Sequence, residues 1–246
     1  MLVKSQVKYI QSLSQKKLRE EEGVFVAEGP KIINELLAAP NVRLRSLFAL
    51  DEWSDDQGSS LTETTKKLLT GISEKELVRI SFLNSPNQVL GVFEKPWFDQ
   101  PVKLKGKLSI VLDTIQDPGN LGTIIRCADW FGVDQVICTE ECADVFSHKV
   151  IQSTMGSVSR VQTLYTDVVE FLSSEQVPVF AAVMDGKNLY ELPKIKEGVI
   201  IIGNESKGIG AGLINSNTNK ITIPRKGSAE SLNAAVATGI ILSHLI

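Results

Sequence analysis

The chain has 246 residues, of which 43% are hydrophobic and 22% are charged, a composition typical of a globular protein and long enough for two domains. No apolar run approaches the roughly 20 residues that cross a bilayer, the N-terminus lacks the apolar core of a signal peptide, and the net charge of −3 argues against tight nonspecific binding to nucleic acid. Three cysteines, Cys127, Cys138 and Cys142, cannot form a disulfide framework, so we expect a reducing cytoplasm.

Charge is divided unevenly along the chain. Residues 1–107 carry 16 Lys and Arg against 14 Asp and Glu, whereas residues 108–246 carry 10 against 15. Five basic side chains and no acid occur in the first 19 residues, namely Lys4, Lys8, Lys16, Lys17 and Arg19. Such an arm either contacts nucleic-acid phosphates or forms a solvated helix face with its stems on the core, and charge alone leaves both interpretations open.

Short helices and strands alternate in the first half. The pattern predicts helices over 4–18, 30–39 and 64–69, strands over 24–27 and 46–50, and a polar loop over 51–60, and the segments 73–77, 79–82 and 89–94 complete a small α/β unit. Pro30 suits the first turn of its helix. Pro96 and Pro101 bracket a polar stretch that ends at Gly106, which predicts domains over 1–95 and 107–246 joined by a linker over 96–106.

From Lys107 onward, apolar strands alternate with helices. Residues 108–112 form a continuous apolar run, which is typical of a strand buried on both faces. We expect further strands over 136–138, 161–164, 177–184, 199–203 and 220–223, and helices over 124–131, 149–157, 168–174 and 232–246. This alternation predicts an α/β fold whose parallel sheet carries helices on both faces. Ligands of such sheets bind beyond the carboxyl ends of the strands.

The first of three short polar segments spans residues 117–126. Its Pro, Gly and Asn residues have the chemistry of a turn, and Asn120 can cap the helix that leads to Arg126. We expect this helix to be well buried, so that Arg126 requires an anionic partner in the protein or in a ligand. The structural alternative is a surface pair between Arg126 and Asp129.

Two further polar segments follow, over 203–208 and 231–233. Glu205 stands at the end of a buried strand, where a carboxylate requires a hydrogen bond or a ligand unless it caps the next helix. Ser231 is predicted to cap the last helix, whose first N–H groups would face the crevice. The G-x-G-x-x-G and Walker patterns are absent, and neither the histidines nor the Cys138–Cys142 spacing indicates a catalytic triad or a metal site.

Taken together and in this order, the three segments are specific for one protein family. The sequence resembles the SpoU (TrmH-like) family of RNA ribose 2′-O-methyltransferases, within the SPOUT class, over about residues 108–246. The resemblance rests on DPGNLGTIIRCADWFGV at 117–133, IIGNESKGIG at 201–210 and ITIPRKGSAESLNAAVATGI at 221–240. Residues 1–95, with FVAEG at 25–29, resemble the L30e-like RNA-binding domain that often precedes this catalytic domain.

The resemblance implies a deep trefoil knot in the C-terminal part of the sheet, where the knot forms a pocket for S-adenosylmethionine (AdoMet) and a homodimer completes the active site. The residues implied to hold the cofactor are Gly203, Ile223, Leu232, Val183 and Met184. The residues implied to form the reacting set are Arg126 as the catalytic residue, Asn120 as its support, and Glu205, Ser231 and Asn233 to position the nucleotide or support the cofactor.

The implied reaction is an in-line attack of a ribose 2′-hydroxyl on the methyl group of a sulfonium. A guanidinium stays protonated at neutral pH and is therefore a poor general base. Arg126 would instead orient the hydroxyl, lower its pKa or act through a substrate phosphate. We expect ribosomal RNA as the substrate, with transfer RNA, a catalytically inactive RNA-binding module and another nucleotide-binding α/β enzyme as alternatives. The intact reacting set speaks against the inactive module.

The stretch 147–157 and one later position depart from the family pattern. That pattern leads us to expect a Pro near His148, a basic residue near Gln152 and a Met in place of Arg225. These positions are expected to flank the RNA, so they bear on the choice of substrate.

Overall fold

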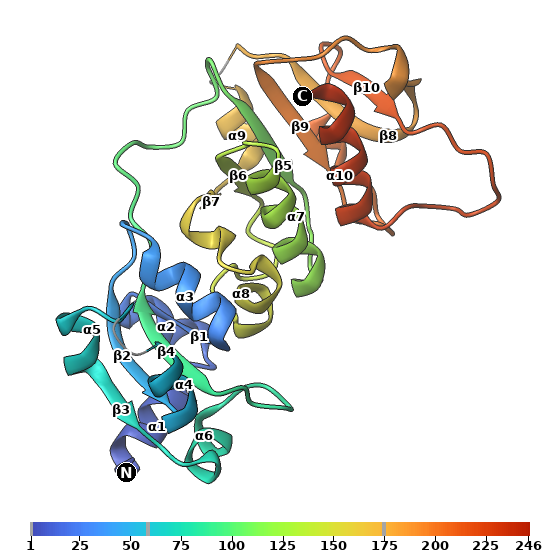
Figure 1. Ribbon diagram of the computed structural model, residues 1–246. Helices are drawn as coiled ribbons and strands as arrows, with labels where there is room; N and C mark the ends of the chain where they lie inside the picture. The colour runs from blue at the N-terminus through green and yellow to red at the C-terminus, as the bar shows by residue number, and fades with distance from the viewer. Residues whose placement is uncertain (1, 58–59, 174–175) are drawn as a thin grey trace. The chain divides into compact units, whose positions relative to one another are not determined.

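The computed structural model describes residues 2–57, 60–173 and 176–246, and the chain divides into two compact units (Figure 1). The first unit consists of Met1–Phe98 and Phe146–Ser159, and the second of Asp99–Val145 and Arg160–Ile246. The stretch 146–159 thus packs with the first unit, although it lies inside the range expected for the second domain. Within the described residues, every helix is too short or too polar to cross a membrane.

The first unit is built on a four-stranded sheet in the order β1-β4-β2-β3, in which only β2 and β3 run parallel. Its strands are β1 (Val24–Glu28), β2 (Leu44–Ala49), β3 (Leu69–Gly71) and β4 (Val89–Glu94). Its helices are α1 (Lys4–Ser12), α2 (Lys16–Glu22), α3 (Pro30–Ala38), α4 (Asp51–Gln57), α5 (Glu63–Leu68), α6 (Glu74–Ile80) and α8 (His148–Thr154), followed by the 3₁₀ turn η2 (Ser157–Ser159).

Helices cover both faces of this sheet. Val24 and Val26 of β1 belong to a core that α1 and α6 complete. Because successive strand residues point to opposite faces, Phe25 faces the other side, where α3 and α8 contact β1. Phe25 stacks on Phe93 with ring centroids 5.8 Å apart and meets Phe146 at 5.5 Å. Phe146, two residues before the start of α8, is therefore part of the core of the first unit.

The single helix expected over 4–18 is wrong, because the chain forms α1 and α2 with a break at residues 13–15. The Ser12 and Ser14 hydroxyls donate to carbonyls three residues earlier, at 2.6 and 2.8 Å, and such bonds compete with the helix. The buried Arg19 guanidinium donates to Leu13 O (2.7 Å) and Ser14 O (2.8 Å) at the end of α1. Arg19 therefore stabilises the break and is not part of an exposed basic arm.

The loop expected over 51–60 is also wrong in its first part, which is the helix α4. Trp53 is 1% exposed and fixes this polar segment to the core. Asp51 and Glu52 stand in the first turn, where the positive end of the helix dipole favours acids. The end of that expected loop at 58–59, like residue 174 of the helix expected over 168–174, lies outside the described residues.

The second unit contains a six-stranded sheet in the order β10-β8-β9-β5-β6-β7, and every neighbouring pair runs parallel. Its strands are β5 (Leu108–Leu112), β6 (Gln135–Cys138), β7 (Gln162–Tyr165), β8 (Val179–Asn188), β9 (Gly198–Ile202) and β10 (Asn219–Thr222). Its helices are α7 (Pro118–Trp130), α9 (Val168–Ser173) and α10 (Ala234–Leu245), with the 3₁₀ turns η3 (Leu189–Glu191) and η4 (Ala211–Leu213). The predicted α/β fold with a parallel sheet is confirmed.

Both faces of this sheet are buried. Val111 of β5 and Ile201 of β9 lie in a core cluster with Val168 of α9 and Leu213 of η4. The alternate residues, such as Ile110, are also fully buried and point to the opposite face. On the second unit α7 and α10 lie side by side (Figure 1). Continuous apolar runs such as 108–112 are the consequence of this two-sided cover.

The strand order of the second unit reverses beside β5. From β5, the chain adds β6 and β7 toward one edge, whereas β9, β8 and β10 lie on the other side. Asp113, directly after β5, donates its backbone N–H to Ile202 O at the end of β9 (2.9 Å). Such a reversal opens a crevice beyond the carboxyl ends of the strands, which is where ligands bind in this architecture.

Candidate functional site

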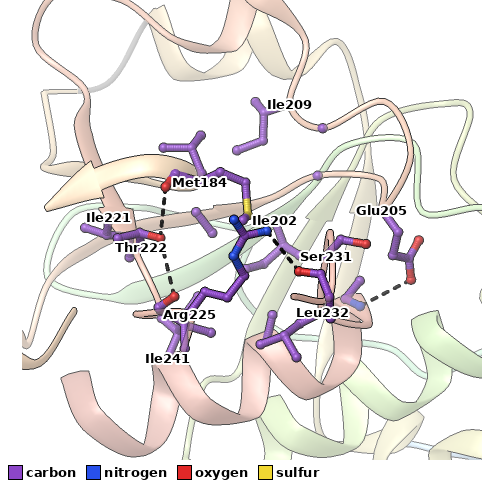
Figure 2. A pocket seen from close by; sticks show the side chains of 18 of the residues that line it. Met184, Ile202, Glu205, Ile209, Ile221, Thr222, Arg225, Ser231, Leu232 and Ile241 are labelled. Atoms are coloured by element: carbon purple, nitrogen blue, oxygen red, sulfur yellow. Dashed lines mark hydrogen bonds between the residues drawn. The ribbon is translucent and has the colours of Figure 1, made fainter. Parts of the chain in front are cut away.

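A cavity of about 470 Å³ lies at the carboxyl ends of β9 and β10 and beside the middle of β8 (Figure 2). Its walls come from residues 182–184 of β8, from the loop after β9, from the loop after β10, and from α10. All five residues expected to hold a cofactor line this cavity, namely Gly203, Ile223, Leu232, Val183 and Met184. The structure thus brings together segments that are as much as 50 residues apart in the sequence.

The lining is mostly apolar. Ile202, Ile209, Ile221 and Ile241 contribute four branched aliphatic side chains (Figure 2). Of the described residues that line the cavity, Glu205 is the only carboxylate, and Arg225 and Lys226 are the only cations. An apolar cavity with a few convergent polar groups suits a small organic ligand with charged ends.

Close backbone approach after β9 requires glycine. A Cβ on Gly203 would lie 2.4 Å from the backbone C and O of Gly208, closer than real Cβ atoms approach. Asn204 and Gly208 exchange backbone hydrogen bonds of 3.1 and 2.8 Å across this tight turn. Asn204 Oδ1 accepts from Ser206 N and Lys207 N, and its Nδ2 donates to Thr114 O at 3.0 Å. Asn204, which had no role in the sequence analysis, therefore holds the turn to the end of β5.

A polar network joins the three segments singled out in the sequence. Asn120 Nδ2 donates to Glu205 Oε1 (2.5 Å), and Asn233 Nδ2 donates to Asn120 Oδ1 (2.7 Å). Glu205 Oε1 also accepts from the backbone N–H of Ala234, the first residue of α10 (3.2 Å). The carboxylate thus lies at the positive end of α10, an arrangement that stabilises its negative charge.

Two expected helix caps are wrong. Asp117, not Asn120, caps α7, because its Oδ1 accepts from Asn120 N at 2.8 Å while Pro118 occupies the first helical position. Asn233, not Ser231, caps α10, because its Oδ1 accepts from the N–H groups of Ala235 and Val236. Ser231 instead lines the cavity. Since Asp117 takes the capping role, the Asn120 side chain remains available for Glu205.

Arg126 stands apart from the cavity and the network. The buried stripe of α7 contains Leu121, Ile124, Ile125 and Ala128, and the 3.6-residue period places Arg126 on the exposed face. The expectation that Arg126 is buried is therefore wrong. Asp129 pairs with Arg160 at 2.9 Å rather than with Arg126. Within the described residues, Arg126 has no ion pair, and it does not line the cavity.

Sequence reasoning missed Asp113 and Thr114 at the end of β5. Asp113 is 9% exposed, and its carboxylate accepts from Gly210 N (2.7 Å) and from the Thr114 hydroxyl (2.9 Å). Thr114 has φ of +57°, a conformation that costs about 1–3 kcal/mol and occurs at functional sites. The signal was available, because Asp113 follows an apolar strand as Glu205 does. Arg225, which was expected to flank the RNA, lines the cavity.

None of the three cysteines lines the cavity. Cys138 and Cys142 are buried thiols. The pKa of Cys142 is lowered to about 7, first through its hydrogen bond with Cys138, and the same bond together with burial raises the pKa of Cys138. Across residues 2–57, 60–173 and 176–246, no three His, Cys, Asp or Glu side chains gather as metal ligands would.

Both units of the chain are similar to known protein families. Residues 107–243 match the model of the SpoU rRNA Methylase family, and residues 4–91 match the MRM3-like substrate binding domain. The 23S rRNA (guanosine(2553)-2′-O)-methyltransferase RlmP of Bacillus subtilis is 32% identical, over 97% of this chain and 95% of that protein.

Solved structures agree with the sequence matches. An AdoMet-bound rRNA methyltransferase from Sinorhizobium meliloti superposes with a TM-score of 0.85 at 31% identity, over 100% of this chain and 95% of that chain. A TrmH-family protein from Porphyromonas gingivalis gives a TM-score of 0.85 at 36% identity, over 100% of this chain and 98% of that chain.

Proposed function

This chain belongs to the SpoU rRNA methylase family, and from that premise we propose that it transfers the methyl group of AdoMet to a ribose 2′-hydroxyl of ribosomal RNA. The observation that carries the proposal is the network of Asn120, Glu205 and Asn233 at the edge of the cavity. It unites three distant polar segments at a crevice where α/β sheets bind ligands. The match covers 95% of RlmP and 95% of the rRNA methyltransferase from Sinorhizobium meliloti, which supports the same reaction.

The cavity fits the cofactor. Its volume of about 470 Å³ lies within the range of small-molecule sites. We assign the adenosine to the backbone of Gly203, Ile223 and Leu232, with Val183 and Met184 beside it. A side chain at Gly203 would close the approach to Gly208, so the site depends on glycine there. When bound, AdoMet supplies a methyl group on an electrophilic sulfonium.

The residues of the reacting set have two kinds of role. Some hold the site together, and others orient the substrate. Glu205 Oε1 accepts both of the carboxylate's hydrogen bonds, from Asn120 and Ala234, while Oε2 has no partner among the described residues. Oε2 is thus available to accept a hydrogen bond from the ribose or to support the cofactor. Ser231 contributes a hydroxyl to the same wall. Arg126, protonated at neutral pH, is assigned to orient the 2′-hydroxyl or to bind a neighbouring phosphate.

The proposed active site includes a second copy of the chain. Arg126 does not line the cavity of its own chain, as expected if it serves a site shared between two protomers. Trp130, one turn further along α7, is 83% exposed, and Val236 of the adjacent α10 is 52% exposed. Large exposed apolar side chains on adjacent helices favour an interface. We therefore infer a homodimer through α7 and α10.

The trefoil knot is part of the same proposal. The chain passes close to itself at Gly186, where a Cβ would lie 2.5 Å from the backbone of Ile221, a residue that lines the cavity. This close approach between β8 and β10 supports a knotted segment in which the loops after β9 and β10 form the cofactor site.

The first unit is proposed to bind the RNA. Residues 4–91 match a substrate-binding domain, which supports this role. Lys16 and Lys17 lie 3.7 and 3.8 Å from Glu20 and Glu21, so their charges are partly offset. Lys4 and Lys8, both exposed, are then the stronger candidates for phosphate contacts. Three free cysteines fit a reducing compartment, and we place the protein in the cytoplasm.

Two measurements test the proposed activity. Calorimetry should show that wild type and Arg126→Ala bind AdoMet alike, because Arg126 is outside the cavity. With labelled AdoMet, the wild type should transfer the methyl group to ribosomal RNA, and Arg126→Ala should not. A base-resolution map of 2′-O-methylation with and without the protein should then identify the modified nucleotide. Absence of AdoMet binding would contradict the proposal. Binding with equal inactivity of both proteins on every RNA would favour the inactive module, and labelling of transfer RNA alone would correct the substrate.

A further inference from the structure

Arg225 lies in the wall of the cavity, where a bound ligand can contact it. Figure 2 shows Arg225, from the loop after β10, with its guanidinium pointing into the cavity beside Ile202 and Met184. Its Nη1 donates to Ala229 O at 3.0 Å, which ties the side chain to its own loop. Within the described residues no carboxylate pairs with Arg225. A guanidinium has five N–H donors, so most of them remain available for a ligand.

The charges in the cavity are separated. Glu205 lies against the N-terminus of α10, away from the Arg225 guanidinium (Figure 2). The remaining cation, Lys226, follows Arg225 in the same loop. One side of the cavity is therefore positive and the other negative, while aliphatic side chains such as Ile202 form much of the remaining lining. A ligand that matches this pattern carries an anion at one end and a cation elsewhere.

An unpaired guanidinium opposes the entry of a cationic ligand. AdoMet has two positive groups, the sulfonium and the ammonium, against one carboxylate. It gains from Arg225 only if the carboxylate faces the guanidinium and the sulfonium lies away from it. Arginine is suited to this contact, because its planar fork can donate two parallel hydrogen bonds to a carboxylate.

We propose that Arg225 binds the α-carboxylate of AdoMet and selects for ligands that retain it. This inference rests on the proposed function and deepens it. Arg225 thereby fixes the orientation of the amino-acid end of the cofactor, so that the methyl group is directed toward the side of the cavity that holds Glu205. Arg225 is a specificity-determining residue for the cofactor, and it takes no part in the reaction itself.

Calorimetry with four ligands and two variants tests the contact. The ligands are AdoMet, S-adenosylhomocysteine, decarboxylated AdoMet and 5′-methylthioadenosine, of which only the first two carry the carboxylate. Arg225→Met should lower the affinity for both carboxylate-bearing ligands about tenfold or more, since hydrogen bonds to charged groups are strong. The same variant should leave the two ligands without a carboxylate unchanged or bind them more tightly.

Lys226→Met is the matched control, because it removes one positive charge from the next residue of the same loop. Lys226→Met should have only a small effect on the affinity for AdoMet and for 5′-methylthioadenosine. Both changes should be smaller than the loss of AdoMet affinity that Arg225→Met causes. Arg225→Lys, which retains the charge without the fork, should recover part of the loss. Arg225 is exposed, so the variants should keep the wild-type Tm.

Two results would overturn the inference. One is an AdoMet affinity that Arg225→Met leaves unchanged, and the other is an equal loss for ligands with and without the carboxylate. Either result leaves the proposed function standing, because wild type would still bind AdoMet. A wild-type protein that binds none of the four ligands would overturn the proposed function and this inference together.

Discussion

Asn120 donates a hydrogen bond to Glu205 over 2.5 Å, although 85 residues separate the two in the chain. The bond ties the first turn of α7 to the loop after β9. Asn233 and Ala234 extend the tie to α10, because they contact Asn120 and Glu205 in turn. The orientation of the Glu205 carboxylate therefore depends on three elements that meet only in the folded chain.

Replacing Asn120 by Ala should slow methyl transfer about 10–100-fold, because it removes a hydrogen bond to a carboxylate that is worth roughly 1.5–3 kcal/mol. AdoMet affinity should change little, since Asn120 does not line the cavity. Single-turnover methylation and calorimetry would measure the two quantities. Asn217→Ala, which truncates an exposed asparagine outside the cavity and the network, is the control and should match wild type. A loss of affinity as large as the loss of rate would contradict the assignment of Asn120.

Replacing Gly203 by Ala should destabilise the second unit by about 1–3 kcal/mol, the usual cost of overpacking. The added Cβ would meet the backbone of Gly208 at 2.4 Å, and backbone cannot swing aside as a side chain can. AdoMet affinity should fall with it. Gly227→Ala provides the control, because Gly227 lines the same cavity and its Cβ would have open space. If thermal denaturation and calorimetry found the two variants alike, the close pass after β9 would not matter for the site.

Gly156→Ala should destabilise the first unit. Gly156 has φ of +94°, and its Cβ would lie 2.7 Å from Glu35 Cβ on α3. Gly23→Ala, in the same unit at φ of +65° with open space, isolates the backbone cost of about 1–2 kcal/mol. We expect Gly156→Ala to cost about 1–3 kcal/mol more than this control, because it adds a steric clash. Urea unfolding of the full chain would show the order, and equal losses would disprove the contact with α3.

The pH dependence of the first unit should include Glu76. Hydrogen bonds from Ser73 N, and then from Leu2 N, lower the pKa of Glu76 from 4.5 to about 2. A depressed carboxyl pKa stabilises the fold above the unfolded value, and this contribution is lost as the pH falls from about 4.5 toward 2. Glu76→Gln should flatten the decline of stability in that window.

Glu74→Gln is the control for Glu76, since it removes the same charge from the first turn of α6 without touching these hydrogen bonds. Urea midpoints at pH 5.5 and pH 3 would be compared for the three proteins. If Glu76→Gln declined as steeply as wild type, the hydrogen bonds from Ser73 and Leu2 would carry no pH-dependent stability.

Apolar runs predicted the second unit well for a physical reason. A strand buried on both faces, such as 108–112, has no polar residue to obscure it, and its carboxyl end marks the crevice. The five expected cofactor residues were assigned from the family resemblance, because the apolar runs mark the crevice but do not say which loops meet there. Arg126 was misplaced because its neighbours Ile125 and Cys127 are apolar, whereas the helical period assigns burial to Ile124, Ile125 and Ala128.

Tertiary partners decided what the sequence left ambiguous. Asp117 and Asn120 are both good helix caps, and the partner Glu205, distant in sequence, is what Asn120 bonds instead. The break after α1 depends on Arg19, which reaches back to two carbonyls. The helix α4 depends on the burial of Trp53 in an otherwise polar segment. None of these contacts can be predicted from the local helix or strand propensity of the sequence.

The excursion of residues 146–159 has a consequence for the evolution of the chain. Phe146 packs on Phe25, and Gln152 donates to Glu28 O at 3.0 Å, so the first unit is completed by a helix encoded within the second. A single crossover at residues 96–106 would exchange most of the first unit but leave its last helix behind. Recombination between relatives therefore preserves both units only when the two stretches travel together, which favours inheritance of the whole chain as one piece.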